Sequence, residues 1–510
     1  MHTLSNKQQI ALNLFTNILS MGIGMLVSIL LTPYVINKLG LVAYGYIGLM
    51  NNITNFMAVI TYTLTSMVAR FLIVSLEKRG PEQASDYISS ALVTNLVMVA
   101  VLFPIITIFS AYADKIFKIE TEFVTDVKIA FVIAGTAFLI NSITLVLAAY
   151  PYAANRLDIS NWVSILGSIV RVSFVFVIFS VLSAQIWLYN LASVLQTLTY
   201  LIIILFFLDK LLPGVKLELQ RFRFDMAWEL LSAGFFNSII LLGNNFLTQI
   251  DLIVGNRFLP GDIVGMYAAI LLLPNTIRNI ASAASLAFSP TTIKLYSSGD
   301  MENLRNYINN AIKFIGILIG WPAAIISGLG VPILHLWLGK DYSDYKYLIV
   351  LMLLPLTVSL AAHQMYIVQQ ASNKVKIPAI ATLLFGVTNV VLAILMVSTF
   401  RLGIFGIVLA GVITATARSV IFYPLYSSLI TRQPKFAYYQ GLFFPVSIAA
   451  ITCAFGIFLQ NYVPIRNFID LFVAASGLST LYFGLTLVFM TKSERSEFLA
   501  QSLAIIKRHA

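Results

Sequence analysis

Apolar runs long enough to cross a membrane follow one another along almost the whole 510-residue chain. A transmembrane helix needs about 20 mostly apolar residues. The segments between these runs are short, none exceeding about 20 residues, so there is no room for a sizeable soluble domain. Charged residues make up only 10% of the chain, against about 25% in soluble proteins. We therefore expect an all-α integral membrane protein whose function lies among its helices.

The apolar runs predict about fourteen transmembrane helices. Cytoplasmic loops are enriched in Lys and Arg. With a cytoplasmic N-terminus, the cytoplasmic segments carry 19 of the 32 basic residues and the opposite side carries 9. We therefore expect both termini in the cytoplasm, and this bias accounts for the net charge of +11 without a nucleic-acid partner. The predicted spans are 11–37, 44–69, 88–111, 127–151, 160–183, 185–208, 228–255, 263–290, 308–334, 347–371, 376–400, 404–430, 439–461 and 466–491.

Polar residues recur at an offset of 220 positions, which indicates an internal duplication of spans 1–6 as spans 7–12. Asn17 aligns with Asn237, and Gly45 aligns with Gly265. Six spans is an even number, so both halves enter the membrane in the same orientation. Transporters built from such parallel repeats alternate access by rocking one half against the other, with the substrate bound where the halves meet.

The repeat predicts two pseudo-symmetric six-helix bundles with two appended helices. We expect a first lobe at 1–208, a cytoplasmic linker at 209–227 and a second lobe at 228–430. Residues 431–510 would then hold spans 13 and 14 and a cytoplasmic tail.

Three arginines, Arg171, Arg278 and Arg418, lie deep inside predicted spans. An ionisable residue near the bilayer centre costs about 2.5–3.5 kcal/mol on insertion scales and usually faces a cavity. An arginine can also bridge helix carbonyls or pair with a buried carboxylate, so a structural role stays open for each of them. Carboxylates are scarce at the same depth, which favours binding of an anionic head group.

Amide side chains are concentrated in the first two spans of each repeat. Small and polar residues also hold membrane helices together, so helix packing is the alternative interpretation. The amides exceed what packing needs, and we expect them to line a polar cavity. The predicted lining residues are Asn17, Asn55, Asn245, Gln249, Asn275 and Asn279.

Two further ionisable residues are candidates for coupling or gating. Asp251 lies in span 7, about one turn from the outer surface, where a salt bridge with Arg257 is the structural alternative. His363 lies in the middle of span 10. Histidine titrates near neutral pH and can handle protons, although a neutral hydrogen-bonded histidine is an equally simple explanation.

A cationic cavity rich in amides suits an anionic ligand with many hydroxyl groups. Arginine holds phosphate oxygens bidentately, and amides bind sugar hydroxyls. A phosphate-linked glycolipid fits this description, and so does a small organic anion. The sequence has no P-loop, no hydrolase motif and no potassium filter.

Local sequence adds a family resemblance that extends over the whole chain. The stretch Thr248–Gly255, followed by Val264–Tyr267, resembles the junction of spans 7 and 8 in polysaccharide-export flippases of the Wzx type. The loop Lys294–Asp300 is similar too. These flippases belong to the multidrug/oligosaccharidyl-lipid/polysaccharide (MOP) exporter superfamily, which also resembles this chain in length, span number and six-plus-six repeat.

The resemblance implies a flippase, not an enzyme, that works by alternating access through a central cationic cavity. Its substrate would be an undecaprenyl-diphosphate-linked oligosaccharide, such as an O-antigen, capsule or exopolysaccharide repeat unit. It would move this substrate to the periplasmic leaflet of a bacterial inner membrane, without a cofactor and coupled to H⁺ or Na⁺. Expected partners are the lipid-linked glycan, membrane lipids and a polymerase of the same pathway, for a protein that functions as a monomer.

Two other functions stay open. An ion-coupled antiporter for small solutes or drugs has the same fold, but such antiporters typically keep carboxylates in the first lobe, and spans 1 and 2 contain none. A lipid II flippase typically has an Arg–Asp pair in span 1, which is also missing here. A membrane polysaccharide polymerase or ligase usually carries a sizeable periplasmic loop, whereas the outer loops of this chain are short.

Overall fold

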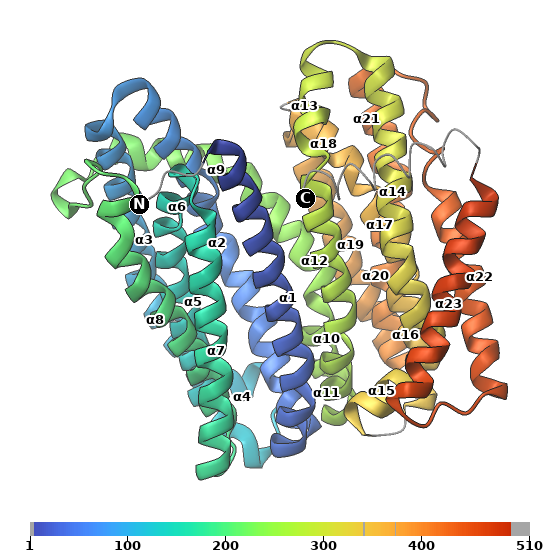
Figure 1. Ribbon diagram of the computed structural model, residues 1–510. Helices are drawn as coiled ribbons and strands as arrows, with labels where there is room; N and C mark the ends of the chain where they lie inside the picture. The colour runs from blue at the N-terminus through green and yellow to red at the C-terminus, as the bar shows by residue number, and fades with distance from the viewer. Residues whose placement is uncertain (1–4, 340–341, 373, 491–510) are drawn as a thin grey trace. The chain divides into compact units, whose positions relative to one another are not determined.

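The protein is built of helices packed side by side, as the computed structural model in Figure 1 shows. The structure describes residues 5–339, 342–372 and 374–490, so the predicted tail beyond Met490 lies outside the described residues. Within this part of the chain, fourteen helical segments are long and apolar enough to cross a membrane. The predicted all-α class and number of spans are confirmed.

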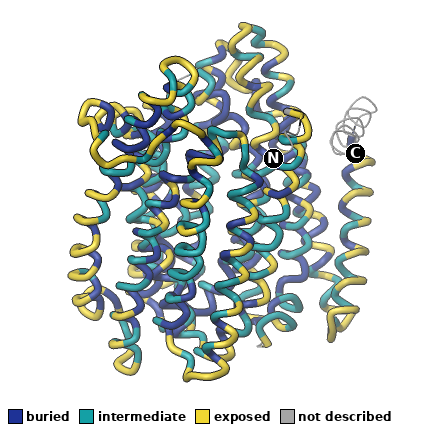
Figure 2. The backbone as a smooth tube through the Cα atoms, turned by 60° about the vertical axis from the view of Figure 1, so that its left-hand side comes forward, coloured by how far each residue is buried: buried dark blue, intermediate teal, exposed yellow. Residues whose placement is uncertain are grey.

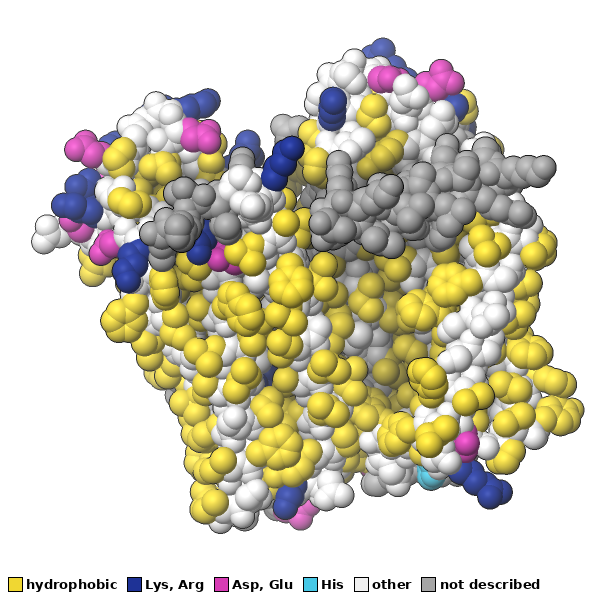
Figure 3. Space-filling view, in the orientation of Figure 1, with side chains coloured by type: hydrophobic (Ala, Val, Ile, Leu, Met, Phe, Trp, Pro, Cys, Tyr) yellow, Lys and Arg dark blue, Asp and Glu magenta, His cyan; other side chains and the backbone are white. Residues whose placement is uncertain are grey.

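Hydrophobic side chains cover the middle of the helices, and charged side chains gather near the helix ends (Figure 3). In Figure 2, exposed and buried positions alternate along many of the helices. An apolar exposed surface in the middle of a helix is what a lipid environment accepts, because hydrocarbon makes no hydrogen bonds. The two ends of each helix are therefore the parts that meet water and head groups.

The chain divides into two compact units. The first unit extends as far as Asn245 and also takes in Leu252–Ala269; the second comprises Phe246–Asp251 and the chain from Ile270 onward. These units do not coincide with the predicted lobes 1–208 and 228–430. The predicted lobes group segments with similar sequence, whereas the units group segments that pack together.

The first unit contains the six spans of the predicted first repeat and most of the next three helices after the linker. Its α-helices are α1 (Asn6–Leu39), α2 (Leu41–Arg79), α3 (Pro81–Ala111), α4 (Ala113–Ile116), α5 (Val124–Leu147), α6 (Ala149–Ala153), α7 (Leu157–Val181), α8 (Ile186–Leu211), α9 (Phe224–Thr248, up to Asn245), α10 (Ile250–Phe258, from Leu252) and α11 (Gly261–Ile270, up to Ala269).

Local sequence sets the limits of the first helices. Ser5 caps α1 through a capping box with Gln8, in which each side chain bonds the other residue's backbone N–H. Gly40 and Gly80 have φ values of +88° and +87°, a left-handed region that residues with a side chain rarely adopt. The long helices α1, α2 and α3 are therefore separated by single glycines.

Three serines of α3 hold the linker against the first unit. The side-chain oxygens of Ser85, Ser89 and Ser90 accept hydrogen bonds from the backbone N–H groups of Lys216, Glu218 and Arg223, at 2.8, 3.1 and 2.9 Å. Arg221 adds ion pairs to Asp86 and Glu218. The linker predicted between the lobes is thus bonded along its length to α3.

Glycine allows α2 and α11 to cross in close contact. A β-carbon on Gly45 would lie 3.0 Å from the Cα of Gly265, and one on Gly48 would lie 2.9 Å from the Cβ of Ala268. Both pairs are separated by 220 residues, the offset of the internal repeat. Equivalent positions of the predicted repeat thus lie side by side at this crossing.

The second unit contains the remaining described helices. They are α12 (Leu272–Leu286), α13 (Ser289–Ser297), α14 (Met301–Gly328), α15 (Gly330–Leu338), α16 (Lys346–Leu353), α17 (Leu356–Ala361), α18 (His363–Ala371), α19 (Lys376–Ser398), α20 (Gly403–Ala417), a π-helix (Arg418–Phe422), α21 (Tyr423–Thr431), α22 (Phe443–Tyr462) and α23 (Phe468–Phe489).

Within the second unit, α14 carries the two C-terminal spans α22 and α23. The Tyr482 hydroxyl of α23 donates to the carbonyl oxygen of Ile317 at 2.9 Å, and the Trp321 indole N–H donates to Ser479 at 3.0 Å. Gly316 leaves room for Pro445 of α22. Spans 13 and 14 are therefore packed against the second unit by specific contacts.

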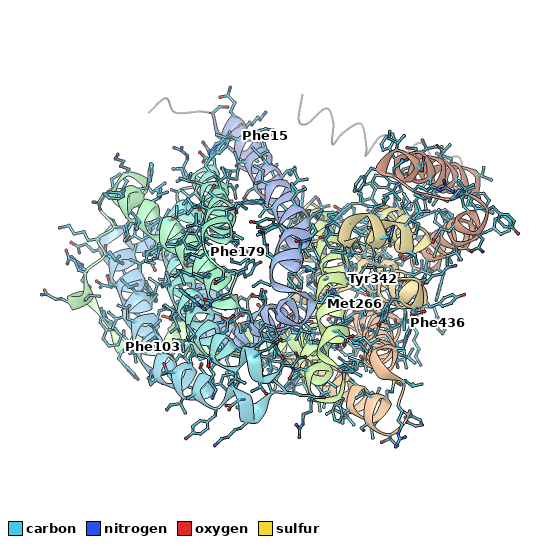
Figure 4. All side chains as sticks on the ribbon, turned by 90° about the horizontal axis from the view of Figure 1, so that it is seen from below. Phe15, Phe103, Phe179, Met266, Tyr342 and Phe436 are labelled. Atoms are coloured by element: carbon cyan, nitrogen blue, oxygen red, sulfur yellow. The ribbon has the colours of Figure 1, made fainter. Side chains whose placement is uncertain are left out.

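The first unit has an apolar interior, and Figure 4 views its helices from below. Phe179 of α7 lies among the helices of the first unit and is 3% exposed, whereas Phe15 and Phe103 lie at its outside. Phe179 belongs to a cluster that includes Val35, Tyr46 and Phe131. This cluster ties α1, α2, α5 and α7 together and fixes the frame in which the polar groups sit.

The α2–α11 crossing gives a test of the fold. A β-carbon on Gly265 would overlap the carbonyl oxygen of Leu41, so we expect Gly265→Ala to lower the melting temperature of the protein in detergent. The control is Gly24→Ala in α1, where a β-carbon meets nothing within 4 Å; it should be neutral or stabilise by about 0.5–1 kcal/mol, because alanine is the better helix former. Equal melting temperatures for the two variants would contradict the close crossing.

Candidate functional site

Polar side chains in the first unit surround a cavity of about 250 Å³ formed by α2, α5 and α8. We call it the amide cavity. Of the predicted lining residues, Asn55 lies here. Asn245 of α9 is buried and donates from its side-chain nitrogen to the carbonyl oxygen of Asn55 at 2.6 Å, so it fixes the backbone at this point. The polar lining includes Asn51, Asn55, Asn141, Asn190, Ser193 and Thr197.

A second cavity of about 270 Å³ adjoins the first, because Asn141, Leu145 and Thr197 line both. We call it the hydroxyl cavity. It lies among α5, α7 and α8, with Ser164, Gln196 and further polar side chains in its wall. The two cavities therefore form one polar region that is confined to the first unit.

Hydrogen bonds between α7 and α8 set the shape of this region. Tyr200 donates to Ser160 at 3.0 Å, and Gln196 donates to Ser168 at 3.5 Å. The carboxylate of Asp126 accepts the backbone N–H groups of Ile186 and Trp187 at 2.8 and 2.9 Å and so caps the start of α8. Two hydrogen bonds thus fix the register of α7 against α8, and Asp126 joins α5 to the start of α8.

Arg171, one of the three predicted arginines, lies on the same seam between α7 and α8. Its Nη2 donates to the Tyr189 hydroxyl at 2.8 Å, and the guanidinium lies 5.2 Å from the centre of the tyrosine ring. Its Nε–H is buried and has no hydrogen-bond partner among the described residues. Residues four apart on a helix share a face, so Arg171 follows Gly167 of the hydroxyl cavity by one turn.

At the start of α1, a different polar group joins α1 to α7. We call it the latch, and it consists of Gln9, Asn13, Asn155, Arg156 and Asp158. Asp158 accepts from Gln9 at 2.8 Å and from both Nε and Nη2 of Arg156 at 2.9 and 3.0 Å, while Asn13 bonds the backbone of Asn155 and Asp158. The polar face predicted for span 1 is thus partly used for packing.

Asn17, predicted to line a cavity, lies one turn beyond the latch and is exposed on α1. Its neighbours on the same helix differ: Asn13 and Thr16 are buried, and Thr16 accepts a hydrogen bond from Asn161 of α7 at 3.1 Å. The position of Asn17 leaves its amide available to a ligand.

In the second unit, Arg418 is the first residue of a π-helix that interrupts span 12. π-Helical turns are uncommon and occur frequently at functional sites. The guanidinium lies 5.3 Å from the ring centre of Tyr423, and Arg418 interacts electrostatically with His363. The His363 ring lies 5.3 Å from that of Tyr366, so the structure brings together two of the predicted residues in an aromatic setting.

Two glutamines hold α18, which carries His363, against its neighbours. Gln364 donates to Ser285 of α12 at 2.6 Å, and Gln369 donates to Ser427 of α21 at 3.2 Å. Both glutamine side chains are fully buried. The position of His363 relative to Arg418 is therefore fixed by bonds on both sides of α18.

Arg278 and two predicted amides occupy one surface of α12. Its Nη1 donates to the Asn275 side chain at 2.9 Å, and Asn275 and Asn279 are exposed. Gln249 and Asp251 belong to the short segment Phe246–Asp251 of the second unit. The Gln249 amide donates to Thr248, and Asp251 is buried.

The sequence analysis missed several cavity residues on α5 and α8, above all Asn141, Asn190 and Thr197. Asn141 is the single amide of α5, and Asn190 shares α8 with one other amide, Gln196. An amide in the middle of a span was the signal that could have found them. Thr197 carries no such signal, because threonine hydroxyls often bond their own helix, as Thr197 does to Val194.

Comparison with known proteins identifies the family. A profile described as polysaccharide biosynthesis protein matches residues 10–296, more than half of the chain. The chain belongs to this polysaccharide biosynthesis protein family. One relative in it, the uncharacterized membrane protein EpsK of Bacillus subtilis (strain 168), is 31% identical over 383 residues, which are 75% of this chain and 76% of EpsK.

Solved structures with a similar fold are transporters of the MOP superfamily. The lipid II flippase MurJ in its inward closed conformation matches 93% of this chain and 98% of its own length, with a TM-score of 0.66 and 15% identity. An inward-facing multidrug resistance MATE family transporter matches 80% and 96%, with a TM-score of 0.64 and 16% identity. The fold is that of the MOP superfamily, as the family resemblance predicted.

The latch gives a test of the α1–α7 seam. Asp158→Asn removes a charge that two partners bond, and we expect it to destabilise the protein by about 1.5–3 kcal/mol, the range for hydrogen bonds to charged groups. Asp225→Asn is the matched control, because Arg223 and Asp225 form an ion pair of the same spacing that is exposed to solvent. Thermal unfolding in detergent compares the two variants. Equal effects would show that the latch contributes no more than a surface ion pair.

Proposed function

We propose that this protein is a flippase that moves a polyprenyl-diphosphate-linked oligosaccharide across a bacterial inner membrane by alternating access. Membership of the polysaccharide biosynthesis family and the MOP fold support transport in a glycan pathway. The relative MurJ is described as a lipid II flippase, a carrier of a lipid-linked substrate. The 19-to-9 distribution of basic residues supports placing both termini in the cytoplasm.

The observation that carries the proposal is the guanidinium of Arg171. It lies in a membrane-spanning helix, and its Nη2 donates to the hydroxyl of a neutral tyrosine. Its Nε–H is buried and has no hydrogen-bond partner within residues 5–339, 342–372 and 374–490. Arginine cannot be deprotonated in a protein, so the charge stays. A buried unsatisfied donor costs about 1–3 kcal/mol, and more when it is charged. A diphosphate oxygen would satisfy both the charge and the donor.

The second unit has two further arginines inside its spans. The guanidinium of Arg418 lies against the ring of Tyr423, and that of Arg278 donates to the Asn275 side chain. Arginine forms bidentate hydrogen bonds with phosphate. We propose each of Arg171, Arg278 and Arg418 as a contact for the anionic head, and each of the exposed amides Asn17, Asn275 and Asn279 as a contact for polar parts of the substrate.

Removal of Arg171 is the direct test. The Arg171→Gln variant loses the charge and the Nε donor, and we expect the initial rate of flipping to fall at least tenfold, since a charge-assisted hydrogen bond contributes about 1.5–3 kcal/mol. The assay uses proteoliposomes that contain an undecaprenyl-diphosphate-linked disaccharide and follows its exposure to a lectin outside. Arg401→Gln, at an exposed arginine between α19 and α20, is the control. A wild-type rate for Arg171→Gln would contradict the proposal.

Asp251 is the residue we propose for coupling to H⁺ or Na⁺. It is a buried carboxylate at the start of α10, in the short segment where the chain passes through the second unit. We expect Asp251→Asn to flip substrate at a rate that no longer depends on an imposed proton or sodium gradient. Asp262→Asn, at an exposed carboxylate in the first turn of α11, should keep the wild-type dependence. A gradient dependence that survives in Asp251→Asn would leave this residue a structural role only.

A further inference from the structure

The amide and hydroxyl cavities of the first unit are large enough for a ligand. Their volumes are about 250 and 270 Å³. Pockets that enclose a whole small molecule begin at roughly 300 Å³, so each cavity suits one part of a larger ligand. One water molecule occupies about 30 Å³ of liquid, so each cavity has room for several waters. A cavity that only satisfies a buried polar group needs one or two.

The walls combine amides and hydroxyls with apolar side chains, which disfavours both ions and purely apolar ligands. Neither cavity is lined by Lys, Arg, His, Asp or Glu. An ion inside would be desolvated without a counter-charge, which is costly. A lipid chain inside would cover the amides of Asn51 and Asn141 with hydrocarbon, at about 1–3 kcal/mol for each unsatisfied group. The ligand that remains is neutral and hydrogen-bonds in many directions.

The polar groups in the walls match hydroxyl groups in particular. Thr65, Ser164 and Thr197 donate their hydroxyl hydrogens to carbonyl oxygens of their own helices at 3.2, 2.9 and 2.9 Å. A hydroxyl has one hydrogen and two lone pairs, so these oxygens still accept from the cavity side. The amides of Asn141 and Gln196 add donors as well as acceptors. Sugar hydroxyls both donate and accept and therefore suit these walls.

The helical register connects the cavities to Arg171. Ser164 and Gly167 of the hydroxyl cavity precede Arg171 by seven and four residues, which places all three along one face of α7. On α8, Tyr189, the partner of Arg171, precedes Ser193 and Gln196 of the cavities by four and seven residues. The cation thus lies one turn from the neutral cavities on both helices.

From this arrangement we propose that the amide and hydroxyl cavities form a glycan site, which holds the first sugars of the substrate while Arg171 holds the diphosphate. This assignment rests on the proposed function for the linkage to a diphosphate. The sugars follow the diphosphate directly in a lipid-linked glycan, and the cavities follow Arg171 directly along α7 and α8. The diphosphate and the sugars therefore follow one another in the substrate as Arg171 and the two cavities follow one another along α7 and α8.

The test separates binding of sugar from binding of diphosphate. The probes are undecaprenyl diphosphate alone and the same lipid carrying a disaccharide, and their dissociation constants are measured by native mass spectrometry on the full-length protein in nanodiscs. For the wild-type protein we expect the disaccharide to tighten binding at least tenfold. For Thr197→Val and Asn141→Leu this ratio should fall towards one, while the affinity for undecaprenyl diphosphate stays unchanged.

Thr107→Val is the matched control for Thr197→Val. The Thr107 hydroxyl donates to the Phe103 carbonyl oxygen of its own helix, as that of Thr197 does to Val194, but Thr107 lies on the exposed side of α3. This variant should keep the wild-type ratio. Thr197→Val removes one hydroxyl and keeps the shape of the side chain. It therefore still tests the glycan site if Asn141→Leu fails to fold.

The outcomes distinguish failure of the glycan site from failure of the proposed function. If both lipids bind to the wild-type protein with the same affinity, or if Thr197→Val and Asn141→Leu keep the tenfold ratio, the glycan site is wrong and a diphosphate carrier remains. If the wild-type protein binds neither diphosphate lipid but binds a neutral disaccharide lipid, and Asn141→Leu abolishes this, the glycan site stands and the proposed function fails.

Discussion

The fold depends on the fact that hydrocarbon offers no hydrogen bonds. Every polar group inside the membrane must therefore find a partner within the protein or line a cavity that water or a ligand can fill. The latch shows the first solution, because Asp158 and Asn13 are bonded on all sides by neighbouring groups. The two cavities and the seam around Arg171 show the second solution, in which polar groups line a space that water or a ligand can fill. The division between these two solutions separates the packing residues from the candidate binding residues.

The sequence predicted the spans well because their length and apolarity depend on local composition alone. It also indicated that arginines and asparagines inside the spans matter, since their cost in a membrane is a property of each residue. It could not predict which amides pack and which line a cavity. Asn13 and Asn17 lie one turn apart on α1, yet one is buried in the latch and the other is exposed. Only the position of α7 decides between them.

Two features depend on contacts that a single sequence does not contain. The repeat predicted from sequence assigns α9, α10 and α11 to the second lobe, whereas most of their residues pack into the first unit. The close crossing of Gly45 and Gly265 requires the absence of side chains on both helices at once. Likewise, the π-helix at Arg418 is a change in hydrogen-bond pattern of a few residues, and no residue type in Arg418–Phe422 requires it.

The Arg171–Tyr189 pair has a consequence for the synthesis of the protein. A lone α7 that entered the bilayer from the translocon would carry an unsatisfied arginine, at about 2.5–3.5 kcal/mol. Only residues 182–185 separate α7 from α8, so the two can insert together as a helical hairpin. Tyr189 is then present from the start to accept the guanidinium N–H. The short loop between these spans thus makes a buried cation compatible with co-translational insertion, before the helices that follow α8 have been made.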